Sequence, residues 1–115
     1  MEIRFESESL RREIENGKKL QKKHGARRAA LIRQRMAEFQ AADCLEDIRY
    51  LPGPRLHQHV RKSRQEKAVF SVDLDHPYRL LFEADHDPEP QLPGGGVDWT
   101  RVTRILIREI TDPHG

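Results

Sequence analysis

The pattern of hydrophobic and polar positions divides the chain into a helical first part and a sheet-forming second part. Ile3 and Phe5 alternate with charged residues, which is the period of a half-buried strand. Between residues 26 and 42 the apolar positions recur every three or four residues, so one face of a helix is apolar. That face consists of Ala29, Ile32, Met36 and Phe39.

Another helix is expected between this strand and residue 25. Ser7 or Ser9 can serve as its N-cap, and Leu10 begins its apolar stripe. Gly17 weakens or ends the helix, whereas the residues after it favour continuation to a stop at Gly25. Two consecutive helices with a glycine between them predict an antiparallel helical hairpin.

From residue 43 onward the pattern changes to short segments. Residues 43–50 are expected to form a short helical turn, which the sequence Leu-Pro-Gly-Pro at 51–54 ends. The polar segment 61–67 and the Pro- and Gly-rich segment 85–98 are expected to be loops. The expected strands are 55–60, 69–74, 78–84 and 102–110, with Trp99 opening the last.

The strands at 69–74 and 78–84 predict their own register. A three-residue loop at 75–77 pairs apolar residues on one face and sets Asp73 opposite Arg79 on the other. A two-residue loop would instead place apolar residues opposite polar ones. The apolar pairs of the favoured register are Leu74–Tyr78, Val72–Leu80 and Phe70–Phe82.

These elements predict a single α+β domain over residues 1–115, in the order β-α-α-β-β-β-β. Two N-terminal helices are expected to pack on a twisted antiparallel sheet. The length of 115 residues suits one domain. Apolar residues make up 36% and charged residues 35%, but the apolar ones cluster with clear periodicity, so a folded core is expected.

The net charge of +2 is unevenly distributed along the chain. Residues 1–42 carry eleven lysines and arginines against six acidic residues, whereas residues 68–98 carry one against seven. A basic surface of this kind suits a phosphate backbone. Charge alone equally fits solvated helix faces, so both interpretations stay open.

Cys44 is the only cysteine, which excludes an intrachain disulfide and a Cys-x-x-Cys metal site. No apolar run approaches the roughly 18 residues that span a bilayer. The first residues lack the apolar segment of a signal peptide. We therefore expect a cytoplasmic protein that does not act at a membrane.

Four segments of the sequence resemble one known family. They are KKHGARRAALIRQRMAEFQAA, LPGPRLH, FSVDLDHPYRLLFE and GGGVDWTRVTRILIREITDPH, and together they cover roughly residues 20–114. Their counterparts are the second helix, the Leu-Pro-Gly stretch, the hairpin and the closing strand of HigB-like members of the RelE/ParE toxin superfamily. That group includes plasmid-maintenance killer and killer-suppression proteins. The hairpin and the closing strand are the more specific parts of this resemblance.

The resemblance implies the toxin of a type II toxin–antitoxin system, with a RelE-like fold. Such toxins typically enter the ribosomal A site and cleave messenger RNA without a metal or other cofactor, through attack of a ribose 2′-OH on the adjacent phosphate. This reaction needs a general base, a general acid and nearby cations. The implied partners are the ribosome, its message and a helix-turn-helix antitoxin.

Two other functions stay open. Other superfamily members poison DNA gyrase, so the chain could be a gyrase-directed or catalytically inactive binding protein. A DNA-binding regulator is the weaker alternative, because the sequence shows no helix-turn-helix with a polar recognition helix.

By position, the resemblance assigns catalytic roles to Arg79, His57 and His114. Arg79 could hold a phosphate through both arms of its guanidinium, and a pair with Asp73 is compatible with that role. His57 could act as acid or base, or be a partly buried, hydrogen-bonded strand histidine. His59 would share its face, but a metal site lacks a third ligand.

Two parts of the family pattern are altered in this chain. Pro113 replaces the tyrosine that normally precedes the terminal histidine, here His114. The basic loop is longer than its family counterpart and lacks the turn glycines. Its cations are still expected to bind RNA phosphates; they are Arg61, Lys62, Arg64 and Lys67.

Overall fold

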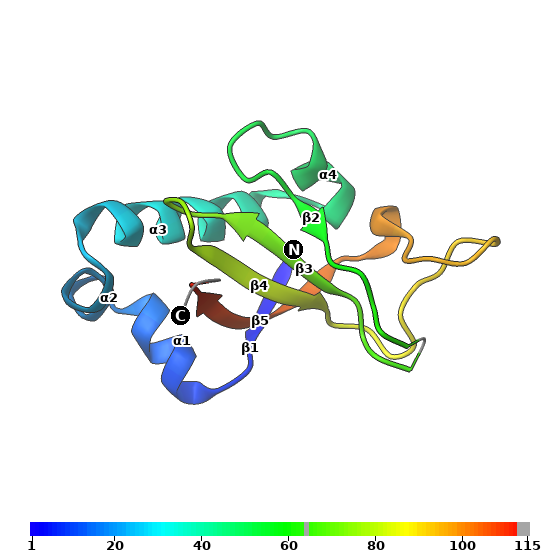
Figure 1. Ribbon diagram of the computed structural model, residues 1–115, viewed down its shortest axis with the longest axis horizontal. Helices are drawn as coiled ribbons and strands as arrows, with labels where there is room; N and C mark the ends of the chain where they lie inside the picture. Colours follow the sequence, from blue (N-terminus) through cyan, green and yellow to red (C-terminus); the bar gives the residue numbers. More distant parts are fainter. Residues whose placement is uncertain (64, 113–115) are drawn as a thin grey trace.

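A five-stranded mixed sheet forms the centre of the structure, a computed structural model that describes residues 1–63 and 65–112 (Figure 1). Within these residues the strand order is β1-β5-β4-β3-β2. The strands are β1 (Glu2–Phe5), β2 (His57–Gln58), β3 (Val69–Asp73), β4 (Arg79–Ala84) and β5 (Arg104–Thr111). The expected α+β class is therefore confirmed.

The expectation of a purely antiparallel sheet is wrong for β1. This strand pairs in parallel with β5, with Ile3 beside Ile105 and Phe5 beside Ile107. Alternation of apolar and charged residues identifies the buried face of a strand, but it carries no information on strand direction. Direction follows from a hairpin only when two strands are close in sequence, and β1 and β5 are at opposite ends of the chain.

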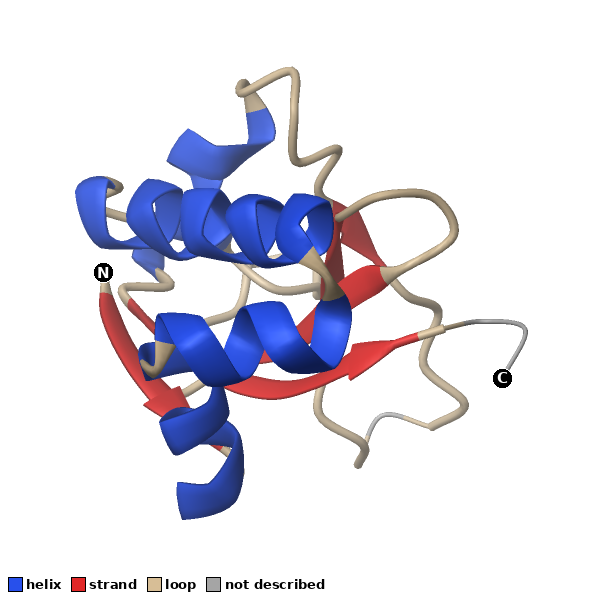
Figure 2. Cartoon of the chain, turned by 90° about the vertical axis from the view of Figure 1, so that its left-hand side faces the viewer, coloured by secondary structure: helices blue, strands red, loops and turns tan. Residues whose placement is uncertain are grey.

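The helical part contains α1 (Glu8–Glu15), α2 (Gly17–His24), α3 (Ala26–Ala41) and α4 (Leu45–Arg49). The helix expected to run to Gly25 is thus two helices, and Asn16 separates them. Asn16 ends α1, and its side-chain oxygen accepts hydrogen bonds from the first amides of α2, at Lys18 and Lys19. Seen from the end of the molecule, the helices lie together with the strands behind them (Figure 2).

The short helical turn expected at 43–50 is confirmed as α4. Among the described residues, no helix is both long enough and apolar enough to cross a membrane.

The β3–β4 hairpin has the predicted three-residue loop and register. Phe70 pairs with Phe82, Val72 with Leu80, and Asp73 with Arg79. The apolar side of the hairpin faces α3, where Phe39 packs edge-on against Phe82 at 5.0 Å between ring centroids. The fully buried side chains of this sheet face include Phe70, Val72, Leu80, Phe82, Ile105 and Ile107.

Two other strand expectations need correction. The strand expected at 55–60 is only two residues long, although the His59 amide still donates to the Val69 carbonyl at 2.8 Å. Trp99 does not open β5 but begins the short 3-10 helix η1 (Trp99–Arg101). Trp99 is packed, because its ring meets Phe70 edge-on at 5.7 Å and its Nε1 donates to the Gln58 side chain at 3.0 Å.

Candidate functional site

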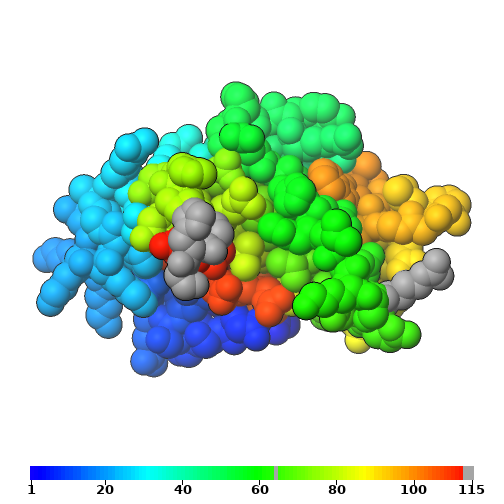
Figure 3. Space-filling model, viewed as in Figure 1, coloured from blue at the N-terminus to red at the C-terminus, as the bar shows by residue number. Residues whose placement is uncertain are grey.

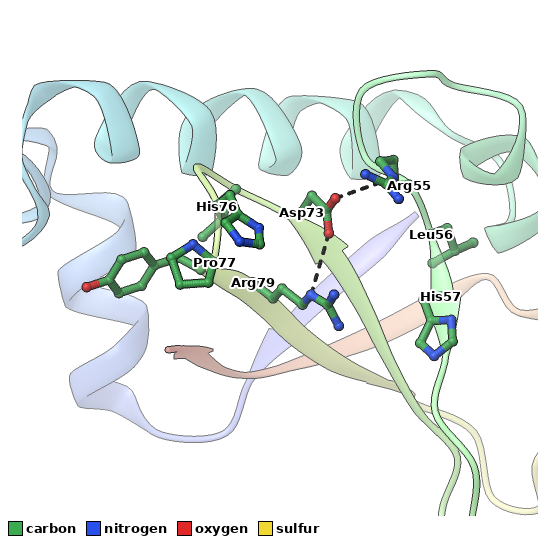
Figure 4. A pocket seen from close by; sticks show the side chains of 9 residues that line it. Arg55, Leu56, His57, Asp73, His76, Pro77 and Arg79 are labelled. Carbon is green, nitrogen blue, oxygen red and sulfur yellow. Dashed lines mark ion pairs between the residues drawn. The ribbon is translucent and has the colours of Figure 1, made fainter. Parts of the chain in front are cut away.

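A hollow of about 640 Å³ lies beside the outer, polar face of the β3–β4 hairpin (Figure 4). In the space-filling view, segment 55–60 in green and the hairpin turn in yellow-green lie on this same face (Figure 3). The hollow brings together β4, the turn at 75–77 and the segment that leads into β2. Its lining residues are Arg55, Leu56, His57, Asp73, Leu74, His76, Pro77, Tyr78 and Arg79.

Asp73 joins two arginines of the hollow. Its Oδ1 lies 3.6 Å from Arg79 Nε, and its Oδ2 lies 3.6 Å from Arg55 Nε (Figure 4). The predicted pairing of Asp73 with Arg79 is therefore confirmed. The Arg79 side chain is 43% exposed and that of Arg55 is 79% exposed, and exposed ion pairs contribute little to stability. Both guanidinium groups can therefore exchange the carboxylate for a phosphate.

His57, in β2, and His59, just after it, bring their rings together, as their spacing predicted. Their rings meet edge to face, with 4.7 Å between centroids. His57 is exposed, whereas His59 is half-buried and its Nε2 lies 2.9 Å from the Ser71 hydroxyl oxygen. The description of a partly buried, hydrogen-bonded histidine thus applies to His59, not to His57.

The two imidazoles differ in their surroundings. Burial, together with the neighbouring His57 and Arg79, lowers the pKa of His59 below its ordinary value. His59 therefore favours the neutral form near neutral pH. An exposed imidazole beside a neutral, hydrogen-bonded one provides two distinct proton-transfer groups next to a pair of guanidinium groups.

Arg55 and His76 are site residues that the sequence analysis missed. Arg55 was expected only as the start of a strand, and His76 only as part of the turn. In the structure Arg55 adopts the left-handed region, with φ of 49°, and it is the one non-glycine residue in the described ranges to do so. The Pro-Gly-Pro sequence before it is the signal for an irregular backbone at this point.

The basic loop lies at the other end of the hairpin from Arg79. Arg61 Nη1 lies 2.8 Å from the Glu89 carboxylate, which also accepts the Ala68 amide at 2.9 Å. This contact ties the basic loop to the acidic segment 85–98. Arg61 and Lys62 line a separate hollow there with the glycines at 94–96, and Lys67 is exposed. Of the described loop cations, Arg61 and Lys62 thus line a different hollow from Arg79 and His57.

Two residues assigned from the sequence, Arg64 and His114, lie outside the described residues, as does Pro113. Within residues 1–63 and 65–112, no group of three or more His, Cys, Asp or Glu side chains is arranged to hold a metal ion. Cys44 is half-buried at the start of α4, where it takes part in a capping box.

The hollow is suited chemically to a phosphate group. Two guanidinium groups face it with only one carboxylate between them, and imidazoles lie beside them. Guanidinium groups bind phosphate with matched geometry, and an imidazole can accept or donate a proton. Three comparisons, with protein-family models, curated proteins and solved structures, found no match to this chain.

Proposed function

We propose that this chain is a HigB-like toxin of the RelE/ParE superfamily, acting as a metal-independent endoribonuclease on messenger RNA at the ribosome. The observation that carries the proposal is that Arg79 and His57 line one open hollow, although they are 22 residues apart in sequence. The hairpin and closing-strand segments that resemble the family support it further.

The proposed reaction is attack of a ribose 2′-OH on the adjacent phosphorus. The 2′-oxygen forms a new bond to phosphorus while the bond to the 5′-oxygen breaks, which leaves a 2′,3′-cyclic phosphate and a 5′-hydroxyl. One proton passes from the 2′-OH to a base, and one passes from an acid to the 5′-oxygen. His57 is assigned to proton transfer, because it is exposed at the hollow.

Arg79 and Arg55 are assigned to the phosphate. Charge on the non-bridging oxygens rises as the pentacoordinate phosphorus forms, and fixed cations stabilise that charge. Asp73 orients both side chains before substrate binds, at 3.6 Å from each Nε. A phosphate entering the hollow then replaces a carboxylate that the guanidinium groups already bind.

The proposed partners are the translating ribosome and a helix-turn-helix antitoxin. An antitoxin that covers the hollow would silence the chain by excluding RNA. Induction of this chain alone should therefore stop growth, and co-expression of its antitoxin should restore growth. Growth that continues during induction, with the protein present and folded, would contradict the toxin assignment.

Cleavage of a defined message in a translation mixture tests the enzymatic proposal. Primer extension should reveal new 5′ ends in ribosome-bound message with the wild-type chain, and these should disappear with Arg79→Ala and His57→Ala. Arg101→Ala is a matched control, because Arg101 is an exposed arginine at the end of η1 that pairs with Asp98, just before η1. Intact message on fully occupied ribosomes would favour the non-enzymatic or gyrase-directed binding protein instead.

A further inference from the structure

Arg35 on α3 is a buried arginine directed toward the candidate site. Only 4% of the residue is exposed, and a buried charge is costly unless it is paired and hydrogen-bonded. Its Nη1 donates to the Glu38 carboxylate at 2.9 Å, its Nε to the Asp73 carbonyl at 2.7 Å and its Nη2 to the Gly53 carbonyl at 3.1 Å. Two of the three contacts are therefore to backbone, not to a countercharge.

The two carbonyls belong to the segments that carry the site. Gly53 lies two residues before Arg55, and Asp73 is the carboxylate between Arg55 and Arg79. The same segments are also joined directly, because the Asp73 amide donates to the Pro54 carbonyl at 2.7 Å. One guanidinium thus connects helix α3, the loop before β2 and the end of β3.

The backbone at Arg55 needs such support. A side chain in the left-handed region is strained and persists only where surrounding contacts hold it there. Arg55 has φ of 49°, and the contacts of Arg35 with Gly53 and of Asp73 with Pro54 come immediately before it. In this conformation the Arg55 Nε lies 3.6 Å from the Asp73 carboxylate.

Gly53 lies directly beside the Arg35 guanidinium. A Cβ atom at position 53 would lie 3.4 Å from Nη1 and 3.5 Å from Nη2 of Arg35. These are ordinary van der Waals distances, so an alanine fits at position 53, and only a side chain larger than alanine would press on the guanidinium.

We propose that Arg35 is a positioning residue, whose buried guanidinium joins the Gly53 and Asp73 carbonyls and thereby holds Arg55 and Asp73 in place at the hollow. Its effect on RNA cleavage rests on the proposed function. Its effect on the conformation of Arg55 does not, so the two can be measured separately.

Arg35→Lys tests this role, with Arg28→Lys as the matched control. Lysine keeps the charge but cannot reproduce the planar fork of arginine. Arg28 is also on α3, and its Nε and Nη2 donate to the Asp75 carboxylate in the hairpin turn at 2.9 and 3.0 Å. Both variants lose a guanidinium contact between α3 and the hairpin, but only Arg35→Lys loses the contact with Gly53.

The direct measurement is the distance between the amide proton and Hα of Arg55 by NMR, which is shorter at positive φ than at negative φ. In Arg35→Lys we expect this distance to lengthen, and in Arg28→Lys to stay as in wild type. The single-turnover rate of message cleavage on ribosomes should fall about 100-fold in Arg35→Lys, the effect of a small misplacement of catalytic groups. Loss of stability alone would lower the rate only in proportion to the fraction of folded protein.

Gly53→Val supplies a second route if Arg35→Lys does not fold. It should lengthen the same distance in Arg55. The double variant Arg35→Lys, Gly53→Val should lengthen it little further, because both changes act on one contact. An unchanged Arg55 conformation in Arg35→Lys, or in Gly53→Val where the first does not fold, overturns the inference, whatever the cleavage rate. A wild-type chain that cleaves no message overturns the proposed function, while the Arg55 measurement still decides the role of Arg35.

Discussion

Replacing Arg79 with alanine tests whether the hollow binds a phosphate backbone. The Arg79 side chain is 43% exposed, and its Nε lies 3.6 Å from the Asp73 carboxylate. An exposed pair of this kind contributes about 0–1 kcal/mol to stability, so Arg79→Ala should remain folded. Any large change in RNA binding then reports on the hollow itself.

The structure sets the size of the expected change. Hydrogen bonds to charged groups contribute about 1.5–3 kcal/mol, so loss of the Arg79–phosphate contact should weaken binding of single-stranded RNA about tenfold or more. For single strands, the logarithm of the binding constant falls with the logarithm of salt concentration with a slope of about −0.7 per neutralised phosphate. Removing one contact should make the slope shallower by about 0.7. Between about 50 and 200 mM salt, the affinity of the variant should therefore fall about 2.6-fold less than that of wild type.

Fluorescence anisotropy of a short labelled RNA, measured over a salt series, gives both quantities. Arg101→Ala is the control, since the Arg101 side chain, at the end of η1, is 59% exposed and its Nε lies 3.0 Å from the carboxylate of Asp98, just before η1. We expect wild-type affinity and slope in this control. An Arg79→Ala slope equal to that of wild type, or an equal loss in Arg101→Ala, would refute the assignment of Arg79 to a phosphate.

Three further predictions concern stability. Phe82→Ala removes a fully buried ring and should lower the free energy of unfolding by about 3–5 kcal/mol in urea titrations. The control Val60→Ala, at a site 94% exposed, should change it by less than about 0.5 kcal/mol. A loss below about 1 kcal/mol in Phe82→Ala would contradict the packing of this ring. Ser7→Ala should lower the free energy of unfolding by about 1 kcal/mol, because the Ser7 side chain accepts a hydrogen bond from the Leu10 amide at the start of α1. Ser9→Ala should lower it less, and a larger loss in Ser9→Ala than in Ser7→Ala would mean that α1 begins elsewhere. The lowered pKa of His59 means that the unfolded chain binds a proton more readily than the folded chain, so stability should fall as the pH drops below about 6.5. His59→Gln should remove part of that fall in a series of unfolding curves, and an identical pH dependence in the variant would show that His59 is not responsible.

The hairpin and the long helix could be predicted because their signals are local. Apolar pairing between 69–74 and 78–84 is satisfied by one loop length, and that loop length sets Asp73 opposite Arg79. The break between α1 and α2 was harder to locate, because a glycine weakens a helix by its backbone freedom, whereas Asn16 ends one helix and begins the next through its side chain.

The candidate site could be predicted only in part. The resemblance pointed to Arg79 and His57, and the alternation of β4 predicted Arg79 on the polar face. Arg55 and His76 gave no periodic signal, because they lie in a loop and a turn. Their position at the hollow depends on contacts between segments distant in sequence, such as the hydrogen bond from the Asp73 amide to the Pro54 carbonyl.

By itself the sequence determined the α+β class, the faces of the strands and the register of the β3–β4 hairpin, since side-chain periodicity and turn length act over a few residues. Only the tertiary structure decided that β1 runs parallel to β5, that His59 rather than His57 is half-buried, and that Arg61 and Lys62 line a different hollow from Arg79. Those outcomes depend on which strands and loops become neighbours in the folded chain. Such contacts bring together residues far apart in the chain, and no local pattern encodes them.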